Sequence, residues 1–441
     1  MGRCYLNNFR GVKHAFNTYT DPANSGVYNA YTGEPMSVAD LQDPSVYPPK
    51  APADAEPIKL AIASDWGSGT MESAAVAELM AQFDAHYTMH MGDVYYESLD
   101  HEIKTAVLGE APNEYQKGVV WPDGSRRTFM LSANHELLSL GYGYFDTLLP
   151  NKDQEASFMS LETEYWRIIG LDTGYGAYNT FDWITAIDEL SETDAPLQDE
   201  QMDWLNATLN LAEACKEDPR GIILTSHHQP FSDFVRDEAY PAAAKQLATL
   251  VPKDCSVLWL SGHEHEFSLY DLNENFDGVE MSVYHRLLGN GGFPQRPQQP
   301  SKHTALKAWD NRKYKTFQKN GGGEEDYVFN GYMTLVLDGP CAVVEYRTFA
   351  CAGGGNATCA VAEGPSFEES TLLATESFAV SADGKVELVD QHLDGSLMTV
   401  LEDGVGLTAD QMSDPPKYRQ RYASLGGDHD KATKKRDEQG W

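Results

Sequence analysis

Short apolar runs alternate with amphipathic segments through the middle of the chain. Residues 58–63 form a mostly apolar run, which is typical of a strand buried on both faces. Residues 71–83 follow with apolar side chains at helical spacing, at Ala75, Leu79 and Phe83. The same reading predicts further strands at 86–91, 127–132, 165–171, 221–226, 256–260 and 281–288, and helices at 199–215 and 242–250. Strands that alternate with helices over residues 58–290 indicate an α/β core.

The pattern changes on either side of this core. Two apolar runs at 331–337 and 342–349 flank Asp338-Gly339-Pro340 and predict a hairpin, and a second hairpin is predicted around Asp383-Gly384. Residues 295–323 are rich in Gln, Pro, Lys and Gly, which indicates a long surface excursion. We therefore expect a loop-rich lead-in over 1–57, a main domain over 58–350, and a C-terminal β-hairpin extension with a polar tail over 351–441.

The charge balance restricts the partners. The 441 residues include 33 Lys and Arg and 67 Asp and Glu, which gives a formal net charge of −34. This charge argues against nucleic acid and against an anionic membrane surface as partners. A phosphorylated substrate would also be repelled unless metal cations reverse the local field. No apolar stretch reaches the roughly 18 residues of a membrane helix, and no signal peptide is visible, which favours the cytoplasm unless a signal has been removed.

The six cysteines are too few for a disulfide scaffold. Cys351 and Cys359 flank a glycine run and are the only two that look like a local pair. A disulfide and two free thiols are equally compatible with this spacing.

Polar residues with metal-binding chemistry follow five of the predicted strands. Sites in open α/β sheets gather at the carboxyl ends of strands, so these side chains are expected to converge in one cleft. Taken singly each signal is weak, because a Gly-Asp pair after a strand is usually a turn and a lone histidine is usually a core residue. The set as a whole favours a metal site, and it consists of Asp65, Asp93-Val94-Tyr95-Tyr96, Asn134-His135-Glu136, His227-His228 and His263-Glu264-His265.

The donor types indicate which metals would bind. Carboxylate, amide, phenol and imidazole groups together favour Fe, Mn or Zn over Ca or Mg. Two metals about 3.5–4 Å apart usually share a ligand, and an aspartate is the expected bridge. Alternate side chains of an extended segment share a face, so His263 and His265 are able to reach adjacent metals.

The order of these motifs resembles that of the calcineurin-like metallophosphoesterases. More narrowly, it is similar to the purple acid phosphatases of the small animal and bacterial type. Gly67 stands where most metallophosphoesterases have a metal-binding histidine, and Tyr96 closes the second motif. Ala133 replaces a glycine that normally precedes the Asn-His pair. The resemblance covers about 58–350 and implies a four-layer αββα sandwich with two mixed sheets and a metal site at the carboxyl ends of the strands.

The resemblance also implies roles for individual residues. Asp65, Tyr96 and His265 would hold the first metal, an iron, and Asp93 would bridge to the second. Asn134, His227 and His263 would hold the second metal, which would be Fe, Zn or Mn. Counting back from Pro230 would select His228 in place of His227, so both histidines stay open, with His227 favoured as ligand and His228 as a substrate-binding neighbour. Asn134 and His135 would contact the substrate, and His135 and Asp93 are the catalytic candidates.

These roles imply a binuclear metal-dependent hydrolase that cleaves phosphate monoesters by in-line attack of a metal-bound hydroxide. The expected partner is a small phosphorylated molecule. A phosphodiesterase acting on cyclic nucleotides or glycerophosphodiesters with the same metals is the alternative. An inactive metal-binding or scaffold protein is disfavoured because every ligand type is present. Tyr95 and Glu136 lie beside the predicted ligands, and the sequence allows either of two roles for them, lining the pocket or supporting the structure. Residues 289–292 form either a loop near the site or a plain turn.

Overall fold

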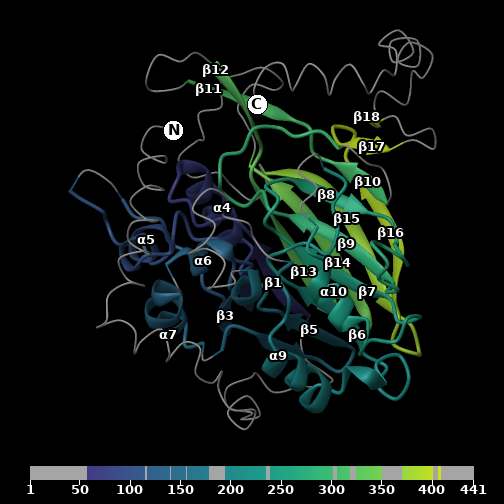
Figure 1. The fold of residues 1–441 in the computed structure, drawn as a ribbon. Coiled ribbons are helices and arrows are strands. Elements are labelled where there is room, and N and C mark those ends of the chain that lie inside the picture. Colours follow the sequence, from purple (N-terminus) through teal and green to yellow (C-terminus); the bar gives the residue numbers. More distant parts are fainter. Residues whose placement is uncertain are drawn as a thin grey trace, which may run out of the picture.

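Two β-sheets packed face to face form the centre of the protein (Figure 1). The computed structural model describes residues 57–114, 117–139, 141–154, 156–177, 194–234, 239–300, 305–317, 324–349, 370–400 and 406–408. The first sheet has seven strands in the order β16-β15-β14-β13-β1-β2-β3. Their bounds are β1 (Ile58–Ala63), β2 (Tyr87–His90), β3 (Arg127–Met130), β13 (Gly331–Asp338), β14 (Cys341–Thr348), β15 (Thr371–Val380) and β16 (Val386–Leu393).

The second sheet has nine strands in the order β18-β17-β10-β8-β9-β7-β6-β5-β4. These are β4 (Met159–Glu162), β5 (Trp166–Gly170), β6 (Gly221–Thr225), β7 (Val257–Ser261), β8 (Phe267–Tyr270), β9 (Val283–Leu288), β10 (Leu306–Trp309), β17 (Met398–Val400) and β18 (Gly406–Thr408). Strands β1, β2 and β3 are parallel to one another, as are β5, β6, β7 and β9, while the outer strands pair antiparallel. Both large sheets are therefore mixed. A separate pair, β11 (Lys313–Phe317) and β12 (Glu324–Val328), forms a two-stranded sheet.

The helices are short. They are α4 (Met71–Gln82), α5 (Asp100–Ala106), α6 (Asn134–Leu138), α7 (Leu149–Asn151), α8 (Gly174–Ala177), α9 (Asp199–Asp203) and α10 (Pro241–Leu247), with π-helical turns at Tyr144–Leu148 and Trp204–Thr208 and a 3₁₀ turn at Leu211–Glu213. Helix α4 begins after Thr70, whose hydroxyl accepts a hydrogen bond from the backbone N–H of Ser73 and so caps the first turn. Among the described residues, no helix has both the length and the apolar character needed to cross a membrane.

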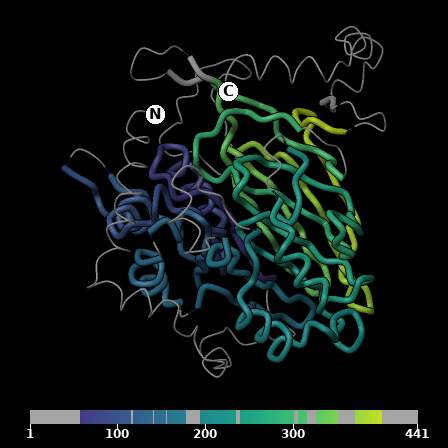
Figure 2. Tube along the Cα trace, in the orientation of Figure 1, coloured from purple at the N-terminus to yellow at the C-terminus, as the bar shows by residue number. Residues whose placement is uncertain are grey.

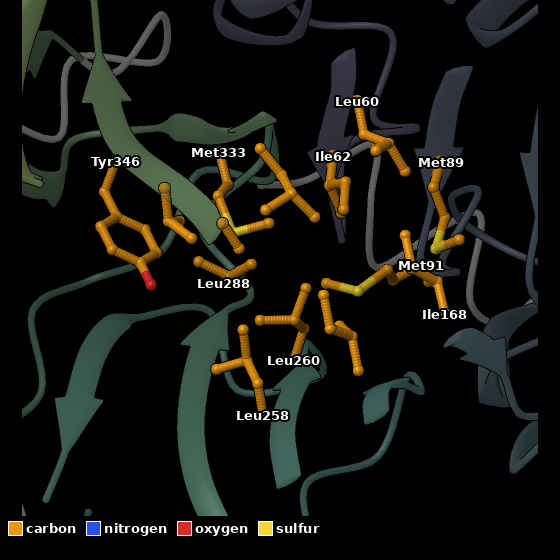
Figure 3. Close-up of a cluster of buried hydrophobic side chains, with 14 of the residues drawn as sticks. Leu60, Ile62, Met89, Met91, Ile168, Leu258, Leu260, Leu288, Met333 and Tyr346 are labelled. Carbon is orange, nitrogen blue, oxygen red and sulfur yellow. The ribbon is translucent and has the colours of Figure 1, made fainter. Parts of the chain in front are cut away.

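The alternation of side chains along β1 separates two layers of core. Leu60 and Ile62 point into the space between the sheets, where they join Leu258 and Leu260 of β7 (Figure 3). Ala61 and Ala63 point the other way, toward Val76 and Leu79 of α4, because successive side chains of a strand face opposite sides. The small alanines allow the helix to approach the sheet closely.

A third apolar cluster covers the outer face of the second sheet. Ile222 and Leu224 of β6 pack there with Trp204 and with Leu247 of α10. Helices thus lie outside each sheet and the apolar interior lies between the sheets, which confirms the predicted αββα sandwich with two mixed sheets.

The C-terminal hairpin is part of the first sheet. Strand β15 pairs antiparallel with β14 over its whole length, and β16 pairs with β15. In the trace of Figure 2 these late strands run beside strands from the middle of the chain. On β15, Glu376 is buried against Arg286 of β9, so this hairpin contributes a charged group to the interior between the sheets.

Several predictions of local structure were wrong. The helix expected over 199–215 ends early, because Asn210 adopts a left-handed backbone with φ of 51° and the chain turns there. The surface excursion expected over 295–323 contains β10, which is inserted between β8 and β17 of the second sheet. Cys351 and Cys359 lie outside the described residues. The disulfide in the described part of the chain joins Cys215 to Cys255.

Candidate metal centre

The predicted site residues follow five strands whose carboxyl ends meet. Strands β1, β2 and β3 lie parallel in the first sheet, and β6 and β7 lie parallel in the second. The residues that follow them sit on the turns immediately beyond these ends: Asp65, Asp93, Asn134 with His135, His227 with His228, and His263 with His265. The site therefore spans the two sheets at one edge.

One cluster of donors consists of Asp65, Asp93 and His265, whose ligand atoms all lie within 4.8 Å of one another. Nε2 of His265 is 3.1 Å from Oδ1 of Asp65. The hydroxyl of Tyr95 lies among the same atoms, 3.0 Å from Oδ1 of Asp65, 3.0 Å from Oδ2 of Asp93 and 2.8 Å from Nε2 of His265. Two carboxylates, one imidazole and one phenol thus converge on one point.

A second cluster consists of His227, His228 and His263. Nε2 of His227 is 3.1 Å from Nδ1 of His263 and 3.4 Å from Oδ1 of Asp93. Nδ1 of His227 donates to the carbonyl of Met91 at 2.9 Å, which places the proton on Nδ1 and turns the lone pair of Nε2 toward His263 and Asp93. The imidazoles of His227 and His263 and the carboxylate of Asp93 thus face one another, an arrangement that suits a cation.

His228 occupies a different environment from His227. Its Nδ1 lies 2.9 Å from the hydroxyl of Thr173, and its ring centroid is 4.8 Å from that of His263. Both histidines thus lie at the second cluster, and Nε2 of His227 also lies 3.4 Å from Oδ1 of Asp93. The geometry therefore favours His227 as the residue that shares a metal with Asp93.

Asp93 connects the two clusters, and Glu136 holds it there. Oδ1 of Asp93 faces His227 while Oδ2 faces Tyr95. The buried carboxylate of Glu136 accepts hydrogen bonds from the backbone N–H groups of Asp93 and Val94, at 3.1 and 2.8 Å, and from the hydroxyl of Ser98 at 3.1 Å. Glu136 is thus a supporting residue that fixes the turn after β2.

The backbone at the ligands is unusual. Asp65, Asp93 and His263 have φ values of 56°, 71° and 71°, a region that residues other than glycine seldom adopt. Such conformations concentrate at functional sites, where the surrounding structure enforces them. At Gly92, with φ of 98°, a side chain would lie 2.5 Å from Cβ of Ala133 and 3.0 Å from the ring of His227. Gly92 therefore makes room for the methyl group that Ala133 brings to this turn.

The pKa values of these groups reflect their burial and their shared charge. Burial and the charges of Asp65 and Glu136 raise the pKa of Asp93 well above its usual range. Burial and the carboxylates of Asp65 and Asp93 likewise raise the pKa of the Tyr95 hydroxyl. Burial lowers the pKa of His227 to about 3, which keeps its imidazole neutral and able to bind a metal. A cation among these donors would favour the charged forms of Asp93 and Tyr95, so the donor set fits a metal ion.

The sequence and the structure favour different tyrosines as the metal ligand. The resemblance to the purple acid phosphatases implied Tyr96 as the phenol ligand, whereas the structure brings the hydroxyl of Tyr95 into the first cluster. The ring of Tyr96 packs against those of His135 and Phe293, with centroids 5.5 and 5.9 Å away. The structure therefore favours Tyr95 for this position.

Asn134 and His135 lie at the start of α6, with Asn134 buried. The backbone N–H of His135 donates to Oδ1 of Asp93 at 3.3 Å, so the start of the helix is docked on this carboxylate. Nδ1 of His135 donates to the carbonyl of Tyr96 at 2.6 Å, and Nε2 lies 3.7 Å from Oδ2 of Asp93. The side chain of His135 is 17% exposed, so it combines contact with the cluster and access to solvent.

Sequence reasoning did not single out Phe293, which follows the glycine-rich loop 289–292. Its ring centroid is 4.3 Å from that of Tyr95 and 4.8 Å from that of His265. The backbone N–H of Phe293 donates to the carbonyl of Asp65 at 3.0 Å, and that of Gly291 to the carbonyl of Ser64. The loop therefore borders the first cluster, and its glycine content was the available signal.

A family model matches the part of the chain that contains both clusters. Residues 58–267 match the family model described as calcineurin-like phosphoesterase, and this stretch contains both clusters. No curated protein matches the sequence. Solved structures with a similar chain path include PhoD, with a TM-score of 0.44 and 12% identity over 85% of this chain and 78% of that chain. Another is GAP50, the anchor in the inner membrane complex of Plasmodium, with a TM-score of 0.41 and 14% identity over 66% of this chain and 84% of that chain.

Proposed function

We propose that this protein hydrolyses phosphate monoesters with the help of two metal ions held at the two clusters. The match to the calcineurin-like phosphoesterases supports a metal-dependent phosphoester hydrolase. The observation that carries the binuclear proposal is the position of Asp93, whose two carboxylate oxygens face different clusters. A carboxylate in this position is suited to bridge two cations.

The donors divide between the two metals. Asp65, Tyr95 and His265 would hold the first, and Asn134, His227 and His263 would hold the second, with Asp93 shared. A phenol among carboxylates and an imidazole suits iron at the first position, and the second position suits Fe, Zn or Mn. This assignment gives Tyr95 the role that the resemblance to the purple acid phosphatases implied for Tyr96.

Each catalytic role follows from these contacts. When bound, the metal ions supply Lewis acidity toward the phosphate and lower the pKa of water. His135 is held by its Nδ1–H bond to the carbonyl of Tyr96, and in its protonated, imidazolium form it would transfer the Nε2 proton to the oxygen of the departing alkoxide. His228, oriented by Thr173, lies at the second cluster in position to contact the phosphate.

Metal analysis together with hydrolysis assays tests this proposal. Wild-type protein should bind about two metal ions and hydrolyse phosphate monoesters faster than diesters. Asp93→Asn should lose at least one metal ion, because the charge between the cations is removed, and its activity should fall at least about a hundredfold. The matched control is Asp390→Asn on the exposed face of β16, which should keep both metals and full activity. Metal-loaded protein that hydrolyses no monoester would refute the proposal, and a faster diester reaction would replace the monoester assignment.

A further inference from the structure

Partly exposed aromatic rings border the metal centre. Asp65, Asp93 and Tyr95 are buried, whereas Tyr96 and Phe293 are partly exposed. Two site histidines share this exposure, since the side chains of His135 and His265 are 17% and 15% accessible. A substrate that reaches the clusters from this side therefore passes Tyr96 and Phe293.

The rings of Phe293 and Tyr96 pack on each other and on neighbouring site residues, and we call this row of rings the aromatic wall. Phe293 packs on Tyr95 and His265, and its ring lies 5.9 Å from that of Tyr96 at an angle of 76°. Tyr96 in turn lies 5.5 Å from His135. The wall thus runs from a candidate metal ligand at one end to the candidate proton donor at the other.

The position of Phe293 is fixed by its backbone. Its N–H donates to the carbonyl of Asp65, and its own carbonyl accepts a hydrogen bond from the side-chain amide of Asn330 at 3.3 Å. The backbone is thus anchored on both sides of Cα, and the ring itself packs on Tyr95 and His265, so it is positioned before the substrate arrives and the ordering cost of binding is reduced.

We propose that Tyr96 and Phe293 form a subsite for a flat, uncharged aromatic group on the alcohol side of the substrate. This inference rests on the proposed function, which places the phosphate at the two clusters and the departing oxygen at His135. The group attached to that oxygen then lies beside Tyr96, the partly exposed ring next to His135, and beside its neighbour Phe293. Aromatic side chains contact a further ring edge-to-face or offset-stacked. An additional anionic group is disfavoured by the net charge of −34.

A matched pair of substrates isolates the aromatic contact. Benzyl phosphate and cyclohexylmethyl phosphate have leaving alcohols of similar acidity and size, and only the first carries a flat ring. We expect kcat/KM to favour benzyl phosphate about two- to tenfold, the size of one favourable aromatic contact. The corresponding phosphonates, which are not hydrolysed, should show the same preference in binding to the metal-loaded protein, measured by calorimetry.

Variants at Phe293 test whether this ring causes the preference for the benzyl compounds. In Phe293→Leu, the benzyl-to-cyclohexylmethyl ratios of kcat/KM and of binding affinity should both fall close to one. Phe293→Tyr keeps a ring and should retain both ratios. The control is Tyr165→Leu, because Tyr165 is 38% exposed and precedes β5, at the end of the sheet opposite the site. This control should leave the ratios unchanged.

The outcomes separate the two proposals. Equal hydrolysis and equal binding of the matched pairs would overturn the aromatic subsite while leaving the hydrolase intact. A preference that survives in Phe293→Leu would overturn it as well. Selective binding of benzylphosphonate that is lost in Phe293→Leu would support the subsite even if no monoester were hydrolysed, in which case the proposed function alone would fail.

Discussion

Arg286 of β9 and Glu376 of β15 form an ion pair in the interior between the two sheets. Nε and Nη2 of the guanidinium lie 2.6 and 2.7 Å from the two carboxylate oxygens, and both side chains are inaccessible to solvent. Tyr346 and Gln391 donate to the same carboxylate, each at 2.7 Å, and Arg286 also donates to the carbonyl of Tyr270. The pair is therefore fully hydrogen-bonded, which is the condition under which a buried ion pair is tolerated.

Removing one charge of this pair should lower the stability of the fold more than replacing both residues with apolar ones. Glu376→Gln leaves the guanidinium without its counter-charge and should lower the free energy of unfolding by about 3–5 kcal/mol. The double variant Arg286→Met with Glu376→Leu removes both charges and should recover most of that loss. Urea denaturation of the three proteins measures this, and a loss below about 1 kcal/mol in Glu376→Gln would show that the pair is not essential.

Tyr95→Phe should change the first metal position. The variant removes the hydroxyl that contacts Asp65, Asp93 and His265, so a visible phenolate-to-iron absorption band should disappear and the iron content should fall. Tyr96→Phe is the matched control and should keep the band. Loss of the band in Tyr96→Phe alone would restore Tyr96 as the ligand, as the resemblance to the purple acid phosphatases implied. Zinc at both positions, with no band in the wild type, would reject the iron assignment.

The two adjacent histidines should differ in their effect on metal content. His227→Ala removes the imidazole that faces Asp93 and His263, so about one metal ion per chain should be lost. His228→Ala removes a side chain that lies next to Thr173, and it should keep both metals and reduce mainly turnover. Metal stoichiometry of the purified variants is the measurement. The opposite pattern would make His228 the ligand.

Acid should destabilise the protein partly through His285. Burial, and then the charge of Arg286, lower the pKa of His285 to about 3, below the value near 6.5 of an unfolded chain. Because the unfolded state binds the proton more tightly, this contribution is fully present above pH 6.5 and is lost as the pH falls toward 3. Between pH 7 and 4.5, wild type should lose about 2 kcal/mol more unfolding free energy than His285→Gln. Equal losses in urea titrations at the two pH values would contradict this.

Much of the fold was predictable because its central strands are short, buried apolar runs. Residues 58–63 and 221–226 were predicted as strands from apolar character alone, and β1 and β6 occupy them. Strand β10 was not predicted, since its partners β8 and β17 lie on either side of it in the sheet but far away in the sequence. Strand pairing between segments so far apart in the sequence leaves no local sequence pattern from which the strand could be predicted.

The candidate site was also predictable only in part. The donors at five strand ends were predictable because parallel strands deliver their ends to one edge of a sheet. The choice between Tyr95 and Tyr96 was not, because neighbouring residues point in different directions and the turn after β2 has a left-handed residue at Asp93. Phe293 was missed because its position depends on backbone hydrogen bonds to Asp65, which lies 228 residues earlier in the chain.

The location of Glu376 affects how the chain completes its fold during synthesis. The segment that matches the phosphoesterase model ends at residue 267, and Arg286 is made soon afterwards, but its carboxylate partner emerges about 90 residues later. A nascent chain that stops before β15 has every candidate metal ligand but lacks the carboxylate that neutralises the buried guanidinium of Arg286. The interior between the two sheets is therefore neutralised only once β15 has been synthesised, so the β15–β16 hairpin completes the core rather than being an appendage.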